Sequence, residues 1–561
     1  MSFLGAQNSI ALGVQGLIHI DTGGGAGNSA DYLLAKSLRF RSSASAYLNR
    51  TFAAGNQKTW TWSGWVKRGT LSNYPVLFSI GSGSLSSNYG AFRFNDGTNK
   101  LEIFDATNNM GVSSIVWEST AVYRDPAAWY HIVVVLDTTQ ASAVNRFSLY
   151  VNGIIQVGSF TVTPAQNANC LFNQAVNHTI GIFAGNYTST SNFDGEMAEV
   201  NFVDGQALAP TAFGASSIYN QWLPIKYAGT YGTNGFYLPF TNAASTTTLV
   251  ADSSGNANNW TPNNISLTAG STYDSLTDVP TLTSTTVANY AVWNAVAAGI
   301  DSVIDNGNLR ISYGSAATRT GTAATIGMTT GKFYWEVTVI SSSANDDQEI
   351  GISNTTANSS VSSGIGYYPG YTANGWGYEG TGNKITGAVA TAYGATYTVG
   401  DVIGVAFDAT AGSLTFYKNN VSQGVAFSSL PATTYFPAVG DGGSTGTVTY
   451  AGNFGQQPFT YTAPSGFLPL NTFNIAAGTV TTSGTFTGNA STDGPMVYLN
   501  GTPTAMTING NAVTFGTQAD KLANGFKVRS SSVLYNLIGS NTYVATTVGA
   551  VFKYEDAQSN P

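Results

Sequence analysis

Apolar residues in this chain recur at a period of two, and no segment carries a long run at the 3.6-residue period of an amphipathic helix. In residues 59–66 the side chains alternate between two faces, as expected of a strand with one buried face. Residues 129–136 and 402–407 are apolar on both faces, which predicts central strands that are covered on both sides. A chain with this pattern has to bury its apolar surface between packed sheets, so the sequence predicts an all-β protein.

Turn-forming dipeptides follow the predicted strands. Asn152-Gly153 and Asn419-Asn420 each come directly after an alternating run, and Asn509-Gly510 lies between two such runs. These residues tolerate the left-handed backbone that tight hairpins require, so each dipeptide predicts a strand-to-strand turn. Residues 520–526 are interpreted as one short helical turn.

Charge is scarce in this sequence. Only 9% of residues are charged, against about 25% in an average domain, and the net charge is −8. The 21 Lys and Arg residues form no run, which excludes a nucleic-acid partner and disfavours an anionic membrane surface.

No apolar run is long enough for membrane insertion. The first basic residue is Lys36, so we expect no signal peptide.

Cysteine and histidine are too sparse for a disulfide framework or a zinc site. Cys170 is the sole cysteine in the sequence and is predicted to be a small buried side chain. His131 lies in a predicted strand and is interpreted as a core histidine. We expect no cofactor: the oxygen-rich stretch 252–258 is interpreted as an Asx-rich turn, with a weak calcium site as the alternative.

Composition and pattern divide the chain into five parts. Residues 1–33 are interpreted as a docking or trimerising segment, with a partly disordered leader as the equal alternative. Residues 34–225 are interpreted as a β-sandwich, and 226–290 as its tail and a linker. Residues 291–470 form a second predicted sandwich, and 471–561 form a small β-rich domain.

Four motifs of the first sandwich resemble the laminin-G-like, concanavalin-type family. They are Trp-Ser-Gly-Trp-Val-Lys at 62–67, Trp-Tyr-His-Ile at 129–132, Leu-Tyr-Val-Asn-Gly at 149–153 and Phe-Asp-Gly-Glu-Met-Ala-Glu-Val at 193–200. The resemblance covers about 190 residues and implies a jelly-roll of two antiparallel sheets.

The second sandwich resembles a SPRY domain. The matching motifs are Gly-Lys-Phe-Tyr-Trp-Glu-Val at 331–337, Ile-Gly-Ile-Ser at 350–353, Gly-Trp-Gly-Tyr at 375–378, Gly-Asp-Val-Ile-Gly-Val at 400–405 and Leu-Thr-Phe-Tyr-Lys-Asn at 414–419. The resemblance implies a second jelly-roll that binds ligands and has no chemistry of its own. The predicted fold is therefore two jelly-roll sandwiches in tandem with a small C-terminal β-rich domain.

The pairing of these two modules resembles tail-fibre or virion-surface proteins of tailed phages. This resemblance implies a non-catalytic virion protein on the tail or capsid surface, released by host lysis. It implies that the chain binds host-surface carbohydrate and other virion proteins, and forms a homotrimer. A capsid-decorating fibre is one alternative, and a glycan depolymerase is another.

The depolymerase alternative depends on three acids, Asp194, Glu196 and Glu199. Laminarinase-type glucanases share the concanavalin sandwich and use Glu-x-Asp-x-x-Glu, whereas here the first two acids are exchanged. On a regular strand Glu199 points away from Asp194 and Glu196, so only a β-bulge can gather all three. The preferred interpretation is a structural motif with a turn at Asp-Gly and a locally paired Glu.

The predicted ligand-binding residues are aromatic and amide side chains in expected loops, where sandwiches place binding sites. Flat apolar rings beside amides are typical of sugar recognition, with loop packing as the alternative. The first group is Tyr367, Tyr368, Tyr371, Asn374, Trp376 and Tyr378, and the weaker second group is Tyr187 and Asn192.

Overall fold

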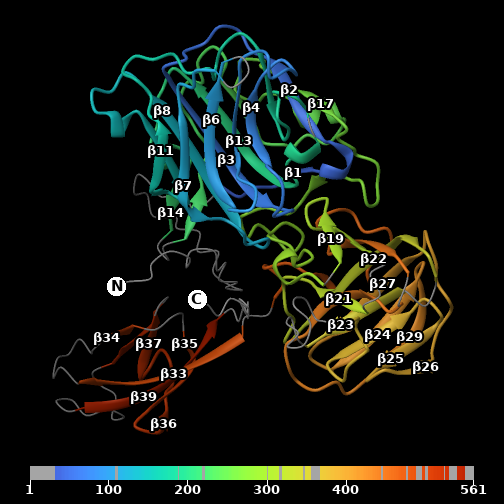
Figure 1. Ribbon diagram of the computed structural model, residues 1–561. Helices are drawn as coiled ribbons and strands as arrows, with labels where there is room; N and C mark the ends of the chain where they lie inside the picture. Colours follow the sequence, from blue (N-terminus) through green and yellow to red (C-terminus); the bar gives the residue numbers. More distant parts are fainter. Residues whose placement is uncertain are drawn as a thin grey trace. The chain divides into compact units, whose positions relative to one another are not determined.

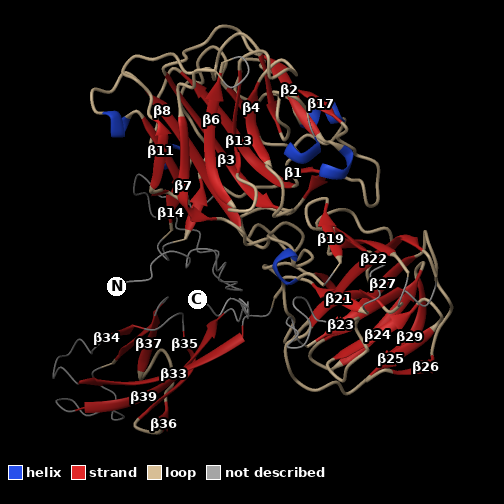
Figure 2. Cartoon of the chain, viewed as in Figure 1, coloured by secondary structure: helices blue, strands red, loops and turns tan. Residues whose placement is uncertain are grey.

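The computed structural model describes residues 32–549, with gaps at 108–110, 188, 218–220, 300, 315–318, 345–347, 355–366, 444–445, 476–477, 488–495, 499–502, 523–524 and 530–539. Its described residues form two compact units, one within 32–472 and one within 473–549. Strands dominate both units, and the α-helix α1 is a single turn at Thr246–Leu249 (Figures 1 and 2). The predicted all-β fold class is confirmed. The predicted docking segment 1–33 lies outside the described residues apart from Tyr32 and Leu33.

The first sandwich consists of two antiparallel sheets. In sheet 1 the strand order is β10 (Ile154–Ile155), β9 (Phe147–Val151), β8 (Trp129–Asp137), β3 (Thr59–Arg68), β13 (Gly195–Asp204), β1 (Ser37–Phe40), β18 (Ser275–Leu276). In sheet 2 it is β11 (Gly158–Val162), β7 (Val116–Val122), β6 (Lys100–Ala106), β5 (Tyr89–Phe94), β4 (Val76–Ile80), β12 (Asn177–Ile180), β2 (Tyr47–Thr51), β17 (Thr261–Asn263). The hairpin β14 (Gly214–Ser216) and β15 (Trp222–Pro224) lies outside both sheets.

The segment 226–290 completes the first sandwich. Its strand β16 (Phe236–Leu238) pairs with β13, β17 pairs with β2, and β18 pairs with β1. This segment and the residues around it cover the face of sheet 1 that points away from sheet 2, and Tyr237 packs there with Val133 and Val203. This cover explains why β8 is buried on both faces, as its apolar sequence predicts.

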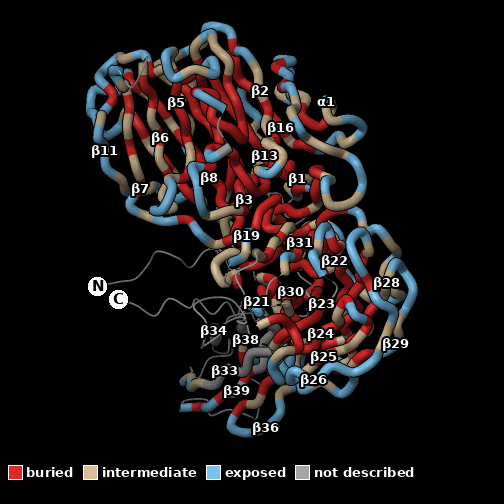
Figure 3. The backbone as a smooth tube through the Cα atoms, turned by 45° about the vertical axis from the view of Figure 1, so that its right-hand side comes forward, coloured by how far each residue is buried: buried red, intermediate tan, exposed pale blue. Residues whose placement is uncertain are grey.

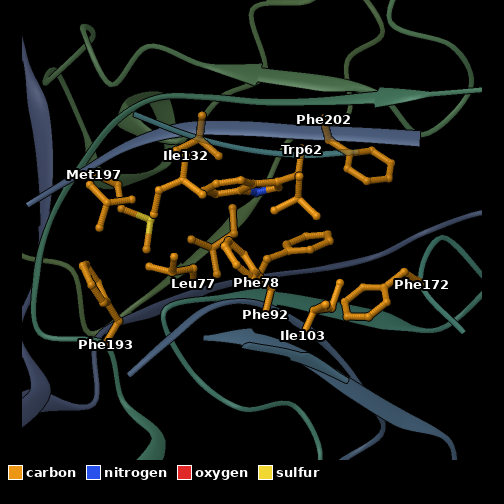
Figure 4. Packing of buried hydrophobic residues seen from close by; sticks show 14 of the residues in the cluster. Trp62, Leu77, Phe78, Phe92, Ile103, Ile132, Phe172, Phe193, Met197 and Phe202 are labelled. Atoms are coloured by element: carbon orange, nitrogen blue, oxygen red, sulfur yellow. The ribbon is translucent and has the colours of Figure 1, made fainter. Parts of the chain in front are cut away.

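The core of the first sandwich is strongly aromatic. Trp62 of β3 meets Phe92 of β5 edge to face, with ring centroids 5.5 Å apart, and Phe202 of β13 lies 5.7 Å from Phe78 of β4 (Figure 4). Each pair joins sheet 1 to sheet 2, and such pairs add about 0.5–1.5 kcal/mol beyond the area that they bury. Cys170 is fully buried in this core, as predicted.

The second sandwich also consists of two sheets. In sheet 3 the order is β19 (Ser302–Asp305), β20 (Arg310–Tyr313), β31 (Val448–Asn453), β22 (Lys332–Ser342), β27 (Val402–Asp408), β28 (Ser413–Lys418), β29 (Val421–Phe427), and β32 (Leu468–Pro469) runs parallel to β22. In sheet 4 it is β21 (Thr320–Ala323), β30 (Phe436–Asp441), β23 (Gln348–Ser353), β24 (Gly375–Glu379), β25 (Asn383–Thr386), β26 (Val389–Ala392). Buried strands run through the middle of both sandwiches, whereas the edge strand β26 is exposed (Figure 3).

The C-terminal unit contains two small sheets. One has the order β33 (Gly478–Thr487), β39 (Ser540–Gly549), β35 (Pro503–Ile508), β36 (Asn511–Ala512), and the other has β34 (Met496–Tyr498), β38 (Gly525–Val528), β37 (Ala519–Leu522). The hairpin at Asn509-Gly510 is confirmed, with φ of 51° and 82°. The helical turn predicted at 520–526 is wrong: β37 and β38 pair there, and Phe526 is buried in this unit's own core.

Candidate functional site

A β-bulge in strand β13 places Glu199 in a strained backbone. β13 pairs with β1 through Met197 and with β16 from Val200 onward, and its register with β3 shifts between Ala198 and Asn201. Glu199 lies at this change of partner with a φ of +52°, in the left-handed region that side chains other than Gly rarely adopt. The β-bulge that would be needed to bring Glu199 to the same face as Asp194 and Glu196 is therefore present in β13.

The carboxylate of Glu199 is held by two tyrosines. The hydroxyl of Tyr237 lies 2.9 Å from Oε1, the hydroxyl of Tyr32 donates to Oε2 at 2.8 Å, and the two hydroxyl oxygens are 2.6 Å apart. Burial raises the pKa of Glu199 to about 7, although the hydrogen bonds from Tyr32 and Tyr237 act in the opposite direction. Glu199 thus ties the start of the described chain to β16.

Asp194 is a hydrogen-bond acceptor for two distant segments. Its Oδ2 accepts from the Ser42 hydroxyl at 2.5 Å and from the Asn306 backbone at 2.7 Å, and its Oδ1 accepts from the Gly307 backbone at 2.7 Å. Asn306 and Gly307 form the turn between β19 and β20 of the second sandwich. The side chain therefore anchors one sandwich to the other.

Glu196 is buried beside these contacts and is 1% exposed. Among the residues that the structure describes, neither of its carboxyl oxygens has a hydrogen-bond partner. Burial raises the pKa of Glu196 well above its ordinary value, and the nearby Asp278 adds to this rise. With Asp194 and Glu199 also buried, no sugar reaches any of the three acids, and the depolymerase alternative is wrong on this geometry.

His131 cannot activate the serine that it touches. The indole Nε1 of Trp222 donates to His131 Nδ1 at 2.8 Å, so the ring proton is on Nε2, which lies 2.9 Å from the Ser63 hydroxyl. A general base needs a free nitrogen toward the nucleophile, and this nitrogen already carries a proton. Burial also lowers the pKa of His131 to about 3. The interpretation as a satisfied core histidine is confirmed.

The stretch 252–258 forms a tight Asx-rich turn. Asp252 Oδ1 accepts from the Ser254 backbone, and Oδ2 accepts from the Ser254 hydroxyl and the Asn258 backbone, each at 2.8 Å. The amide of Asn256 points its nitrogen, not its oxygen, at the carbonyls of Gly232 and Gly235. In the part of the chain that the structure describes, no three His, Cys, Asp or Glu side chains come together as a metal site.

The predicted aromatic group on the second sandwich divides into core and surface residues. Trp376 and Tyr378 lie in β24, not in a loop, and both are buried. The Trp376 ring packs edge to face on Tyr435 at 5.4 Å, and Tyr378 is fully buried with its hydroxyl on the Ala395 carbonyl. Tyr368 is buried as well, so these three rings stabilise the sandwich and present no face to a ligand.

The remaining residues of this group form a surface that we call the Tyr371 surface: Tyr367, Tyr371 and Asn374, with Arg319. Tyr367 and Tyr371 stack with ring centroids 4.2 Å apart, and the Arg319 guanidinium lies 5.4 Å from the Tyr371 ring. Both rings are partly exposed, and Arg319 and Asn374 are exposed. Sequence analysis missed Arg319, which lies about 50 residues before the tyrosines and carries no local motif.

The second predicted group is on the first sandwich. Tyr187 is 38% exposed at a φ of +52°, and its hydroxyl accepts from the Asn177 side chain at 2.7 Å. Asn192 is buried, and its amide nitrogen donates to the Ser42 carbonyl and the Ser45 hydroxyl. The structure therefore separates the two residues: Tyr187 is on the surface, and Asn192 fixes a turn.

Two family models match this chain. Residues 41–211 match the concanavalin A-like lectin/glucanases superfamily, and residues 332–457 match the SPRY domain. The chain thus contains a concanavalin-like domain followed by a SPRY domain, which confirms both modules of the sequence prediction.

Curated relatives of this chain are eukaryotic Ran-binding proteins. Over 166 residues, 28% of this chain, it is 33% identical to Ran-binding protein 9 of Xenopus tropicalis, 32% to the Ran-binding proteins 9/10 homolog of Drosophila melanogaster and 31% to Ran-binding protein 9 of Homo sapiens. These matches cover 29%, 16% and 22% of the respective relatives, so the chain spans less than a third of their length.

These relatives overturn the phage interpretation. The predicted virion location, tail-fibre or capsid-decorating role, release by lysis, virion partners, host-surface glycan and homotrimer all depended on a resemblance to phage proteins. The pairing of two sandwich modules does not discriminate between phage fibres and other interaction proteins, because the same fold serves many functions.

Among the described residues, no helix has the length and apolar character needed to cross a bilayer.

Proposed function

We propose that this chain is a non-enzymatic interaction protein whose SPRY sandwich binds a segment of a partner protein at the Tyr371 surface. The single observation that carries the proposal is the exposed stack of Tyr367 and Tyr371 with Arg319 beside it. Tyrosine and arginine are the residue types most enriched at the energetic centres of protein interfaces.

The surface combines three kinds of contact. The paired rings offer flat apolar area at low cost in side-chain entropy, because each tyrosine has only two rotatable angles. The Arg319 guanidinium donates up to five hydrogen bonds and keeps its charge at any physiological pH. The exposed amide of Asn374 can donate to and accept from the backbone of a bound peptide. A peptide with an aromatic or aliphatic anchor next to a carboxylate fits this set.

Packing contacts and a backbone hydrogen bond hold parts of the Tyr371 surface in place. Tyr371 packs against Tyr368 at 5.4 Å, and the buried Tyr368 is next to β30 through the close approach of its Cβ to Gly440. Asn374 directly precedes β24, and its carbonyl accepts from the Asn354 backbone at 2.9 Å. A surface held in this way binds with little ordering cost, which favours affinity.

The non-enzymatic part of the proposal is supported by the candidate chemistry of the chain. The three acids of β13 are buried, and the ring of His131 is fixed with its proton toward Ser63. The relatives that match this chain are named for binding to Ran and not for a catalysed reaction.

Ran, after which the relatives are named, is the first partner to test. Binding of Ran to the full chain is measured by isothermal titration calorimetry with wild type and Tyr371→Ala. We expect the variant to raise Kd at least about tenfold, since loss of an interface anchor costs about 1.4 kcal/mol or more.

Tyr74→Ala is a matched control, because the Arg93 guanidinium lies 4.2 Å from the Tyr74 ring on the first sandwich. It should bind like wild type. If Ran does not bind, peptides selected from a random library on wild type should still lose binding to Tyr371→Ala. Equal binding of selected peptides to both proteins would refute the Tyr371 surface as the binding site.

A further inference from the structure

A row of four buried side chains, three of them from charged residue types, crosses sheet 1 beneath the second sandwich. Trp129 of β8 pairs with Lys67 of β3, Lys67 with Glu196 of β13, and Glu196 with Arg39 of β1. Directly opposed residues on neighbouring strands project from the same face, so these four side chains lie side by side. All are buried, with Lys67 0% and Arg39 1% exposed.

Two aspartates satisfy the cations of this row. Asp278 accepts from Lys67 Nζ at 2.7 Å and from the Trp129 indole at 3.0 Å. Asp274 accepts from Arg39 Nε at 3.1 Å and from Arg41 Nε at 2.8 Å. Each aspartate thus accepts hydrogen bonds from charged donors, which are shorter and stronger than hydrogen bonds between neutral groups.

The β19–β20 turn of the second sandwich closes over the row. Besides the two backbone bonds to Asp194, the carbonyl of Asn306 accepts from Arg39 Nη1 at 3.5 Å, and its side chain accepts from the Ser43 hydroxyl at 2.8 Å. Asn308 donates to the Arg68 carbonyl at 3.0 Å. The turn runs through consecutive left-handed residues, with φ of 57°, 72° and 57°, which aims neighbouring backbone N–H groups at one anion.

Glu196 lies under this turn, and no residue in the described part of the chain donates a hydrogen bond to its carboxyl group. A Cβ on Gly307 would lie 2.3 Å from Glu196 Oε1, so only glycine fits over the carboxyl. The three cations Arg39, Arg41 and Lys67 already face three aspartates, Asp194, Asp274 and Asp278. An ionised Glu196 would add a further buried negative charge to which no described residue donates a hydrogen bond, which is unfavourable.

We propose that Asp194 and Glu196 form a proton-dependent latch between the two sandwiches. The turn at 306–308 docks on Asp194 only while Glu196 beneath it is neutral, and ionisation of Glu196 loosens the docking. Closing the latch at neutral pH therefore takes up one proton from solution.

Closure of the two sandwiches weakens as pH rises, because the Glu196 carboxyl has a different pKa in the closed and open states. Burial raises the pKa of Glu196 in the closed state, whereas in an open state the carboxyl meets water and has its ordinary pKa. Between these two values the closed state binds one proton more, so closure weakens about tenfold for each unit of rising pH. Closure is strongest below the ordinary pKa of a glutamate and is lost as pH rises toward the closed-state value.

The other charged groups around Glu196 do not reverse this sign. Lys67 on β3 and Arg39 on β1 favour its anion, while Asp278 and Asp194 oppose it, and burial is the largest effect. On the docked hairpin, Asp305 and Arg310 pair with each other at 2.5 Å and add no net charge. Arg68 is directed to the Tyr123 carbonyl and lies over the Phe94 ring.

The test measures the distance between the sandwiches in the full chain by double electron–electron resonance. Nitroxide labels are placed at Ser86→Cys and Thr391→Cys, both exposed. Cys170 is fully buried and does not compete for the label. From pH 6 to pH 9 we expect the distance distribution of the wild type to broaden and lengthen, and that of Glu196→Gln to stay narrow.

Asp194→Ala should give the open distance distribution at every pH. Asp137→Ala is the control, because it removes a carboxylate that is hydrogen-bonded to Thr139 and Gln140 elsewhere on the first sandwich. This control should behave like wild type. The same pH response in Glu196→Gln and wild type, or a narrow distribution in Asp194→Ala, would overturn the proposal. If Asp194→Ala does not fold, Gly307→Ala tests the contact from the other side and should also give the open distribution.

Discussion

Replacing Glu199 by glutamine should stabilise the first sandwich at alkaline pH and leave its stability unchanged at acidic pH. Glutamine has the same shape and meets the same backbone strain at a φ of +52°, so the strain cancels in the comparison. Its amide can accept from one tyrosine and donate to the other, which preserves the cluster with Tyr32 and Tyr237. The remaining difference is that glutamine does not ionise.

The magnitude follows from the pKa of Glu199, which burial raises from 4.5 to about 7. The unfolded chain ionises near the lower value, so the folded state holds one extra proton between them, and stability falls as pH rises. At about 1.4 kcal/mol for each pH unit, the wild type loses about 3 kcal/mol relative to glutamine by pH 8. At pH 4 both side chains are neutral, and the difference disappears.

The assay is urea unfolding of both proteins between pH 4 and pH 8.5, followed by tryptophan fluorescence. Glu118→Gln, a partly exposed glutamate paired with Lys100, is the matched control and should show no stabilisation at high pH. Tyr32→Phe removes one donor to the carboxylate and should extend the pH-dependent loss to higher pH. Equal midpoints of wild type and Glu199→Gln at pH 8 would refute the reasoning.

Two further predictions concern buried side chains. Trp376→Ala should lower the free energy of unfolding of the SPRY sandwich by about 3–5 kcal/mol, because it removes a core ring that packs on Tyr435, and thermal melts check this; a variant with wild-type stability would mean that the ring is not core. Cys170 should react with a thiol reagent at pH 8 only after unfolding, since burial raises its pKa to about 12, and rapid labelling of the native protein would contradict this.

Local chemistry made the turns and central strands predictable. The backbone of Asn152-Gly153 has φ of 49° and 77°, the left-handed conformation that these residue types favour, and the hairpin forms where the sequence places it. The buried strand at 402–407 was equally readable, because a run of apolar residues on both faces has no stable position at a surface.

The ligand-binding prediction was harder because glycine flanks were interpreted as loop signals. Gly375 and Gly377 lie in β24, where added Cβ atoms would meet the backbone of Pro369 and Gly370 at 2.2–3.4 Å. The glycines allow a neighbouring segment to pack tightly on the strand, and this packing buries Trp376. Glycines in a strand that is covered by another segment look the same in sequence as glycines in a loop. They can be told apart only when the segment that packs on the strand is known.

The sequence by itself determined the class of fold, the two modules and the turns, because these depend on alternation and backbone preferences over a few residues. Only the tertiary structure decided what the polar side chains do. Asp194 receives donors from Asn306 and Gly307, more than 100 residues away, and within the second sandwich Arg319 reaches Tyr371 from a distant point in the sequence. Whether a carboxyl is a surface charge, an anchor or a buried neutral acid depends on the water and donors around it, and long-range packing sets both.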